Sequence, residues 1–347
     1  MNRNIKAALY ALLAALFYAL NVPFSKRLLQ QVPPTLMASF LYFGAGAGVG
    51  ILYLFHWKKE QREDRLTRQD LPYTIGMVVL DILAPIFLML GIHIGSSANA
   101  SLLGNFEIVA TTLIALLVFK ENVSRKLWAA VALITISSII LSFEGSGSVQ
   151  FSAGSLLVLL AAVCWGLENN YTRKISEKST YQIVTIKGLC CGAGSFVVAA
   201  VAGESLPKAA YVLLAMILGF VAYGLSIFLY IRAQRDLGAA KTSAYYSVAP
   251  FIGAFLAFVV NGEQLTAAYL FGLLFMIAGT VLVAVDTLAC THRHVHTHLI
   301  THTHGGTTHT HTVTHEHSHH HIGPAHRHSH HHGKELLQEM HSAHTMR

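Results

Sequence analysis

The chain has 347 residues, of which 53% are hydrophobic and only 12% are charged. Soluble domains usually carry about 25% charged residues, so this composition excludes an ordinary soluble protein. The formal net charge of +7 does not indicate a nucleic-acid partner, because the basic residues lie mainly in short segments between long apolar ones. The expected partner is the lipid bilayer, and no nucleic acid is expected.

Ten apolar segments follow one another along the chain, each about long enough to cross a hydrocarbon core of about 30 Å as a helix. The connections between them are short. This pattern predicts an all-α membrane protein of about ten transmembrane helices. We expect these helices near residues 5–25, 35–56, 72–92, 98–119, 126–143, 153–172, 181–203, 208–230, 239–260 and 267–287.

Positively charged residues predict how these helices are oriented. Sixteen Lys and Arg residues lie in the segments on one side of the membrane, whereas the other side has only Lys26, Arg27 and Lys208. Short loops rich in Lys and Arg stay in the cytosol. We therefore expect a multi-pass protein of the cell (inner) membrane with both termini in the cytosol, as an even number of spans also requires.

An internal repeat divides the membrane region into two halves. Residues 17–27, FYALNVPFSKR, resemble residues 164–174, CWGLENNYTRK, and residues 94–101, IGSSANAS, resemble residues 237–244, LGAAKTSA. Each half has five predicted helices, an odd number, so the second half enters the bilayer with the opposite polarity. Inverted repeats of this kind recur in secondary transporters. The expected division is a first repeat over 1–145, a second repeat over 146–288 and a tail over 289–347.

These segments resemble the drug/metabolite transporter superfamily, specifically its EamA-type transporters, across residues 1–288. FYALNVPFSK and CWGLENNYTRK are similar to the family's signature of an aromatic residue, glycine and polar residues, although Tyr18 stands where the family often has Trp. Residues 94–124 and 237–266 are similar to its fourth-span and ninth-span patterns. The resemblance implies ten helices in two inverted repeats around a central cavity that opens to one side at a time. It does not fix the small-molecule substrate.

Polar side chains within the apolar segments are candidate substrate or coupling-ion contacts, because a charged group at the bilayer centre costs at least about 2.5 kcal/mol. Glu107 lies near the middle of its predicted span, and Asn105 is a neighbour that can help to satisfy it. We expect Glu107 to face the central cavity and to couple transport to protons. The alternative is a protonated, structural glutamate that bonds to a neighbouring helix.

Asp81 is a second acidic residue near the centre of a predicted span, four residues before Pro85. Proline removes one backbone hydrogen bond from a helix and frees a carbonyl group. Asp81 is therefore either an ion or substrate contact, or a structural carboxyl group that bonds to the freed backbone.

Glu168, Asn169 and Asn170 form a polar step in the sixth span, and Asn21 aligns with Glu168 in the repeat. An acid at one position and an amide at its mate predict an asymmetric binding surface around the pseudo-twofold axis. The alternative is that Glu168 reaches the membrane interface and pairs with Arg173 or Lys187. Lys187 itself is expected to extend its ammonium group to the nearby membrane boundary.

Gly44, Gly46, Gly48 and Gly50 give the second span the small-xxx-small spacing that lets helices approach closely. We expect these glycines to pack against neighbouring helices of the same chain. A homodimer is the other use of the same motif.

The tail holds 20 of the 22 histidines, many of them alternating with threonine. Imidazole suits zinc, nickel, cobalt and copper, so the tail is expected to bind divalent metal ions at several interchangeable sites. It lacks the apolar residues for a core and should be disordered without metal. A pH-sensitive tail is the alternative, and no other cofactor is expected. The candidate ligands are His292, His294, His296, His298, His302, His304, His309, His311, His315, His317, His319, His320, His321, His326, His328, His330, His331 and His332.

The segment His315–His319 formally matches HExxH, but that motif requires a stable helix and arises by chance in a histidine tract. No enzymatic activity is expected. The sequence favours a secondary-active transporter, expected to export a small metabolite, with a metal-binding regulatory tail. A divalent metal exporter is an alternative that the scarcity of histidine in the spans disfavours. A membrane-anchored metal buffer or sensor is the other alternative, although a single span would suffice for it.

Overall fold

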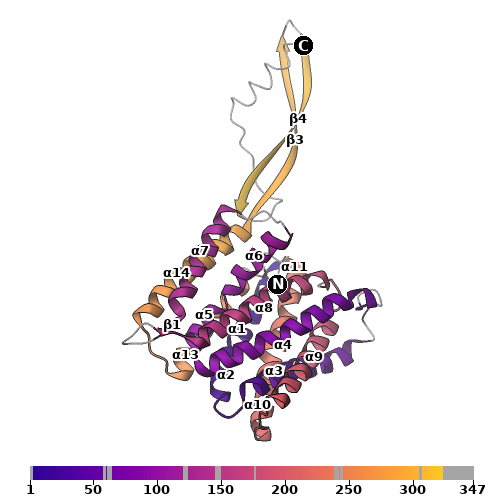
Figure 1. Ribbon diagram of the computed structural model, residues 1–347. Helices are drawn as coiled ribbons and strands as arrows, with labels where there is room; N and C mark the ends of the chain where they lie inside the picture. Colours follow the sequence, from indigo (N-terminus) through magenta and orange to yellow (C-terminus); the bar gives the residue numbers. More distant parts are fainter. Residues whose placement is uncertain are drawn as a thin grey trace. The chain divides into compact units, whose positions relative to one another are not determined.

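The computed structural model describes residues 3–57, 60, 65–119, 124–144, 150–175, 177–237, 242, 245–304 and 307–322. They fall into two compact units, a helical unit up to Asp286 and a second unit from Thr287. The helices are α1 (Arg3–Ala19), α2 (Asn21–Leu28), α3 (Pro34–His56), α4 (Leu71–Ile94), α5 (Ser97–Leu103), α6 (Phe106–Phe119), α7 (Arg125–Leu141), α8 (Ala153–Ile175), α9 (Thr180–Val201), α10 (Ala209–Gly219), α11 (Ser226–Leu237), α13 (Ala249–Asn261) and α14 (Ala267–Leu288) (Figure 1).

The described part of the helical unit also has four shorter elements. A 3₁₀ helix, Arg68–Asp70, leads into α4, and a π-helical segment, Phe220–Leu225, joins α10 to α11. Strands β1 (Phe143–Glu144) and β2 (Gln150–Phe151) form a two-residue antiparallel pair between α7 and α8.

Seven of the described helical segments are long and apolar enough to cross a membrane, and they match seven of the ten predicted spans. This confirms a multi-pass helical membrane protein. The predicted span 98–119 is instead divided into α5 and α6, which are separated by Gly104 and Asn105. Helices α7 and α13 have only 17 and 13 residues. The total of ten spans therefore stays a prediction.

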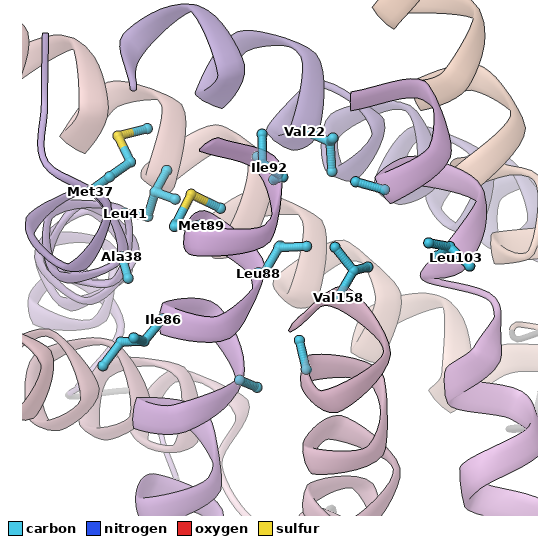
Figure 2. Close-up of a cluster of buried hydrophobic side chains, with 14 of the residues drawn as sticks. Val22, Met37, Ala38, Leu41, Ile86, Leu88, Met89, Ile92, Leu103 and Val158 are labelled. Carbon is cyan, nitrogen blue, oxygen red and sulfur yellow. The ribbon is translucent and has the colours of Figure 1, made fainter. Parts of the chain in front are cut away.

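The apolar core of the helical unit includes the contacts of α4 with α3 and with α8. Figure 2 shows Met37 and Leu41 of α3 beside Met89 of α4, and Val158 of α8 near Leu88 of α4. All of these side chains belong to one buried apolar cluster. Lipid tails are as apolar as these residues, so close packing rather than removal from water holds the helices together. The shapes of the side chains therefore decide which helices adjoin.

Glycine lets α3 and α9 approach each other closely. A Cβ atom on Gly46 would lie 2.6 Å from the backbone nitrogen of Leu189, and one on Gly188 would lie 2.3 Å from the backbone of Gly46. A Cβ atom on Gly44 would likewise collide with the backbone of Met216 in α10. The glycines of the second span thus pack against helices of the same chain, as the sequence favoured.

Charged residues of one half of the helical unit cap helix ends in the other half. Glu204 accepts hydrogen bonds of 2.8 and 3.1 Å from N–H groups at the start of α3, and Glu263 accepts bonds of the same lengths at the start of α5. In return, Arg27 donates to the carbonyl group of Val260 at the end of α13. Helix ends leave unpaired backbone groups, and these charges satisfy them across the boundary between the halves.

The second unit is a β-hairpin in the part of the tail that the structure describes. Strand β3 (Ala289–His304) pairs with β4 (Thr307–Ile322) in an antiparallel register along their whole length. Disorder without metal was predicted for the tail, whereas these residues form paired strands; threonine recurs at alternate positions, and β-branched residues favour extended strands. Of the predicted ligands, His326, His328, His330, His331 and His332 lie outside the described residues.

Candidate substrate and coupling site

A buried group of ion pairs joins three helices near the centre of the bundle. The Lys187 ammonium group of α9 lies 2.7 Å from Oδ2 of Asp81 in α4 and 2.9 Å from Oε1 of Glu168 in α8. Lys187 is 9% exposed, Glu168 3% and Asp81 not at all. The Thr172 hydroxyl group also donates a hydrogen bond to Glu168. We call Asp81, Glu168 and Lys187 the charged cluster.

The charged cluster carries one net negative charge when all three groups are ionised. Charges inside a low-dielectric bundle are costly unless they are paired. The single ammonium group of Lys187 is shared between two carboxylates, so one negative charge is not fully compensated. A proton, or the cationic group of a solute, would supply the missing charge. Either one would compete with Lys187 for its carboxylate partners.

A second polar group, without charge, joins three other segments. The amide nitrogen of Asn21 at the start of α2 donates a 3.0 Å hydrogen bond to the Tyr223 hydroxyl group. The Ser25 hydroxyl group donates to the amide oxygen of Asn21 at 3.1 Å. The ring of Tyr42 in α3 packs against that of Tyr223, with centroids 5.1 Å apart. We call Asn21, Tyr42 and Tyr223, all of them buried, the neutral cluster.

Tyr223 lies within the π-helical segment Phe220–Leu225. A π-helical turn holds one more residue than an α-helical turn, and such turns are frequent at functional sites. The next residue, Gly224, approaches α3 closely, because a Cβ atom there would lie 3.2 Å from Cα of Ala45. The local distortion and this close approach together place Tyr223 between Asn21 and α3.

Each member of the charged cluster has a counterpart in the neutral cluster, at the corresponding place in the other half of the chain. Asn21 aligns with Glu168 in the sequence repeat, and the other members lie on the second and third helices of each half. In that order, Tyr42 on α3 corresponds to Lys187 on α9, and Asp81 on α4 corresponds to Tyr223 ahead of α11. Helix packing follows the same correspondence. The contact of α4 with α8 matches that of α11 with α1, and α3 packs against its own counterpart, α9.

Tyr42 packs against the Tyr223 ring, and its helix α3 also packs against α4 and α9, which carry Asp81 and Lys187. Tyr18 extends the aromatic side, with its ring centroid 6.0 Å from that of Tyr223 and 5.8 Å from that of Tyr246. Aromatic rings from α1, α3 and the π-helical segment thus gather around the neutral cluster.

The structure brings Glu107 and Asn169 together, in a pair that is separate from the ion pairs of Lys187. The amide nitrogen of Asn169 donates a 2.5 Å hydrogen bond to Oε1 of Glu107. Glu107 lies in the first turn of α6, directly after the break at Asn105, and not in the middle of one long helix as predicted. It is partly exposed, and Asn169 is exposed.

The other two predicted amides differ in their surroundings. The Asn170 side chain donates to the carbonyl oxygen of Gly166 in its own helix at 2.9 Å, which makes it a local helix contact. Asn105 is 4% exposed at the break between α5 and α6, and its amide nitrogen has no hydrogen-bond partner among the described residues.

Sequence reasoning named Lys187 only as a possible partner of Glu168 at the membrane interface, and it missed the tyrosines of this site. Lys187 was expected to extend to the membrane boundary, whereas its ammonium group is held inside by two carboxylates. The clue in the sequence was that two acids and one base lay within three apolar spans, because pairing them with one another is less costly than burying each of them alone. The tyrosines gave no such signal, because aromatic residues are common throughout apolar helices.

Within the set of residues whose side chains the structure describes, no three His, Cys, Asp or Glu side chains gather closely enough to hold a metal ion. The tail histidines lie outside that set.

A polytopic helical bundle with paired charges and polar groups buried between its two halves defines a membrane transporter. The sequence model of the EamA-like transporter family matches this chain twice, over residues 5–143 and 152–285. The chain therefore belongs to the EamA-like transporter family, within the drug/metabolite transporter superfamily.

Similar proteins agree with this assignment. An uncharacterized transporter of Methanothermobacter thermautotrophicus is 25% identical, with 72% of this chain and 78% of that protein covered. The uncharacterized transporter YyaM of Bacillus subtilis is 22% identical, with 72% and 82% covered. A crystal structure with 17% sequence identity superposes with a TM-score of 0.61 over 81% of this chain and 96% of its own, which shows a shared fold.

Proposed function

We propose that this transporter is a secondary-active exporter of a small metabolite, and that the charged and neutral clusters form its substrate and coupling-ion site. The observation that carries the proposal is the position of Lys187 between Asp81 and Glu168. Buried ion pairs add little to stability, since replacing them by well-packed apolar residues is often neutral or stabilising. A function therefore accounts for the charged cluster better than stability does.

Coupling would arise from competition for the two carboxylates. When a proton neutralises Asp81 or Glu168, Lys187 keeps only one ionised partner and the site loses its net negative charge. A conformation that is costly with the extra charge then becomes accessible, because only differential stabilisation of two states moves a transporter between them. We assign coupling to the charged cluster rather than to Glu107, because Glu107 is partly exposed and already bonded to Asn169.

The neutral cluster indicates the chemistry of the solute. Asn21 and Tyr223 offer hydrogen-bonding groups, and Tyr42 and Tyr18 offer aromatic faces, which suit the body of a small organic molecule. The charged cluster suits a cationic group on the same molecule. A bare metal ion fits less well, because the Lys187 ammonium group occupies the place next to the carboxylates that a metal would take.

The proposed architecture is ten membrane helices in two inverted five-helix repeats, residues 1–145 and 146–288, in the cell (inner) membrane. The matched helix contacts of α4 with α8 and α1 with α11 support two related halves. The imbalance of basic residues supports placing both termini in the cytosol.

We also propose that the tail over 289–347 binds zinc, nickel, cobalt or copper and regulates transport. Its histidines support this role, since neutral imidazole is the commonest protein ligand for these ions. Ten spans exceed what an anchor for a metal buffer or sensor requires, so the helical unit is assigned the transport function itself.

Proteoliposomes with an imposed pH gradient and an internal pH dye test the proposal. A panel of amino acids, nucleosides, sugars and antimetabolites is added, and solute-dependent proton flux is recorded. We expect flux with at least one solute, loss of that flux in Lys187→Met, and normal flux in Lys174→Met, which changes an exposed lysine. Unchanged flux in Lys187→Met would show that the charged cluster is not the site. Deletion of residues 291–347 should abolish the response to added zinc but leave flux intact.

A further inference from the structure

The register of the β-hairpin sets histidine opposite histidine. Three successive pairs on the same face are His292 with His319, His294 with His317, and His296 with His315, and a fourth pair is His302 with His309. Residues two apart in a strand share a face. Of the 13 histidines in the two strands, 12 therefore lie on one face, which we call the histidine face, and only His320 lies on the other.

The sequence supports the same register independently of the structure. Histidine occupies even positions from 292 to 304 and odd positions from 309 to 321, with Ile300, Val313 and His320 as the interruptions. Two residues with Gly-Gly between alternating segments are typical of a tight hairpin connection. That change of parity is what an antiparallel pair with a two-residue connection needs to place both sets of histidines on one face. A chain of interchangeable ligands would need no such order.

The spacing of these pairs suits metal binding. Opposed residues in antiparallel strands have Cα atoms about 4.5–5.5 Å apart, and the next pair on the same face follows about 7 Å along the strands. Two adjacent pairs thus present four imidazole groups in one small area. Zinc takes four nitrogen or sulfur ligands in a tetrahedral arrangement, and nickel and copper also favour imidazole.

We infer that the histidine face is a row of defined binding sites for divalent transition metals, each formed by two adjacent cross-strand histidine pairs, with the strongest over residues 292–296 and 315–319. This inference rests on the proposal that the tail binds metal. It goes further, because strand register, and not only the number of histidines, decides which imidazoles act together. Metal would in turn hold the hairpin in this register, since binding to the folded form stabilises it.

Two insertions that keep every histidine test the inference in the full-length protein in nanodiscs. One threonine inserted between Leu299 and Ile300 shifts the pairing of the preceding residues by one position. His294, His296 and His298 then face Ser318, Glu316 and Thr314. Two threonines inserted at the same place shift the pairing by two positions, and the same three histidines then face His319, His317 and His315.

Zinc and nickel affinities are measured by calorimetry and by competition with a chromophoric chelator. We expect the single insertion to weaken the tightest class of binding by at least about tenfold, the smallest loss usual when a metal site is disturbed. We expect the double insertion to bind as the original chain does. If all three chains bind metal equally, the inference that strand register defines the sites is overturned, but the proposal that the tail binds metal stands. If the original chain binds no metal, the proposal that the tail binds metal is itself contradicted.

A pair of double substitutions keeps the hairpin length unchanged. His294→Ala with His317→Ala removes the central histidine pair. The matched control, His298→Ala with His311→Ala, removes two histidines of the same face that lie opposite Val313 and Ile300. We expect the first variant to lose the tightest class of sites and the control to keep it. An equal decrease in both would contradict the inference, since it would show that the ligands are interchangeable.

Discussion

The charged and neutral clusters are built from residues at corresponding places of two related halves, yet their chemistry differs. In one, a lysine is held between two carboxylates at 2.7 and 2.9 Å. In the other, an amide donates to a tyrosine at 3.0 Å and the lysine position is taken by Tyr42. The same packing scheme therefore supports two kinds of polar group. The difference teaches that the fold supplies the positions and the side chains supply an asymmetric site, with charge in one cluster and none in the other.

The comparison also predicts which cluster is more sensitive to change. Loss of one member of the charged cluster leaves charges without partners, whereas loss of one member of the neutral cluster leaves a hydrogen-bonding group without a partner. The first is the more costly in a medium without water. Four substitutions test this ranking, from the largest expected effect to the smallest.

Lys187→Met should have the largest effect, because it leaves Asp81 and Glu168 buried without a counter-charge. Breaking a buried ion pair in this way costs about 3–5 kcal/mol of folding free energy. We expect a marked fall in the thermal unfolding midpoint in detergent, measured by intrinsic fluorescence, or no folded protein at all. Lys174→Met, at an exposed position of α8, should unfold as the original chain does. A Lys187→Met protein of unchanged stability would show that the carboxylates do not need it.

Gly188→Val should disturb both clusters together, because α3 carries Tyr42 and α9 carries Lys187. A Cβ atom on Gly188 would lie 2.8 Å from the carbonyl oxygen of Tyr42. Overpacking of this kind costs about 1–3 kcal/mol. We expect a lower unfolding midpoint and loss of solute-dependent flux, whereas Cys190→Val, at an exposed position of the same helix, should change neither. Normal flux in Gly188→Val would show that the two clusters do not depend on this helix contact.

Tyr223→Phe should have a small effect on stability, because it removes only the hydrogen bond from Asn21. Hydrogen bonds between membrane helices contribute about 0.6 kcal/mol on average. We expect weaker solute binding, seen as a higher half-saturating concentration, with little change in the unfolding midpoint. Tyr171→Phe, at an exposed tyrosine, is the control. A destabilisation as large as that of Lys187→Met would contradict the ranking of the two clusters.

Glu107→Gln should have the smallest effect, since glutamine keeps the oxygen that accepts from Asn169. Substitutions at partly exposed positions usually change stability by about 0.5 kcal/mol or less. We expect the proton dependence of flux to remain. Flux that no longer responds to the pH gradient would move the coupling role from the charged cluster to Glu107.

Much of the helical unit follows from the order of apolar and polar residues. Seven predicted spans coincide with long apolar helices, because a bilayer requires about 20 apolar residues with all backbone groups bonded internally. The break at Asn105 was not predicted, because the segment 98–119 is apolar enough to read as one helix. The hairpin was also missed, although the alternation of histidine and threonine was its signal.

Of the candidate site, the sequence located Asp81, Glu168 and Asn21, but it named a partner only for Glu168, and placed that pair at the membrane interface. A span shows that an acidic residue is buried but not which helix lies beside it. Lys187 illustrates this, because its place near a membrane boundary favoured a path to water. Only the packing of α9 against α3 and α4 turned it inward.

By itself, the sequence determined that this protein spans the membrane many times, that its halves repeat and that its tail gathers histidine. Each of these depends on composition and periodicity, which are local properties. Tertiary structure alone decided that one lysine neutralises carboxylates from two other helices, and that an amide and tyrosines stand at the corresponding places. Those contacts depend on distances of a few ångströms between segments far apart in the chain, which close packing sets and residue order does not reveal.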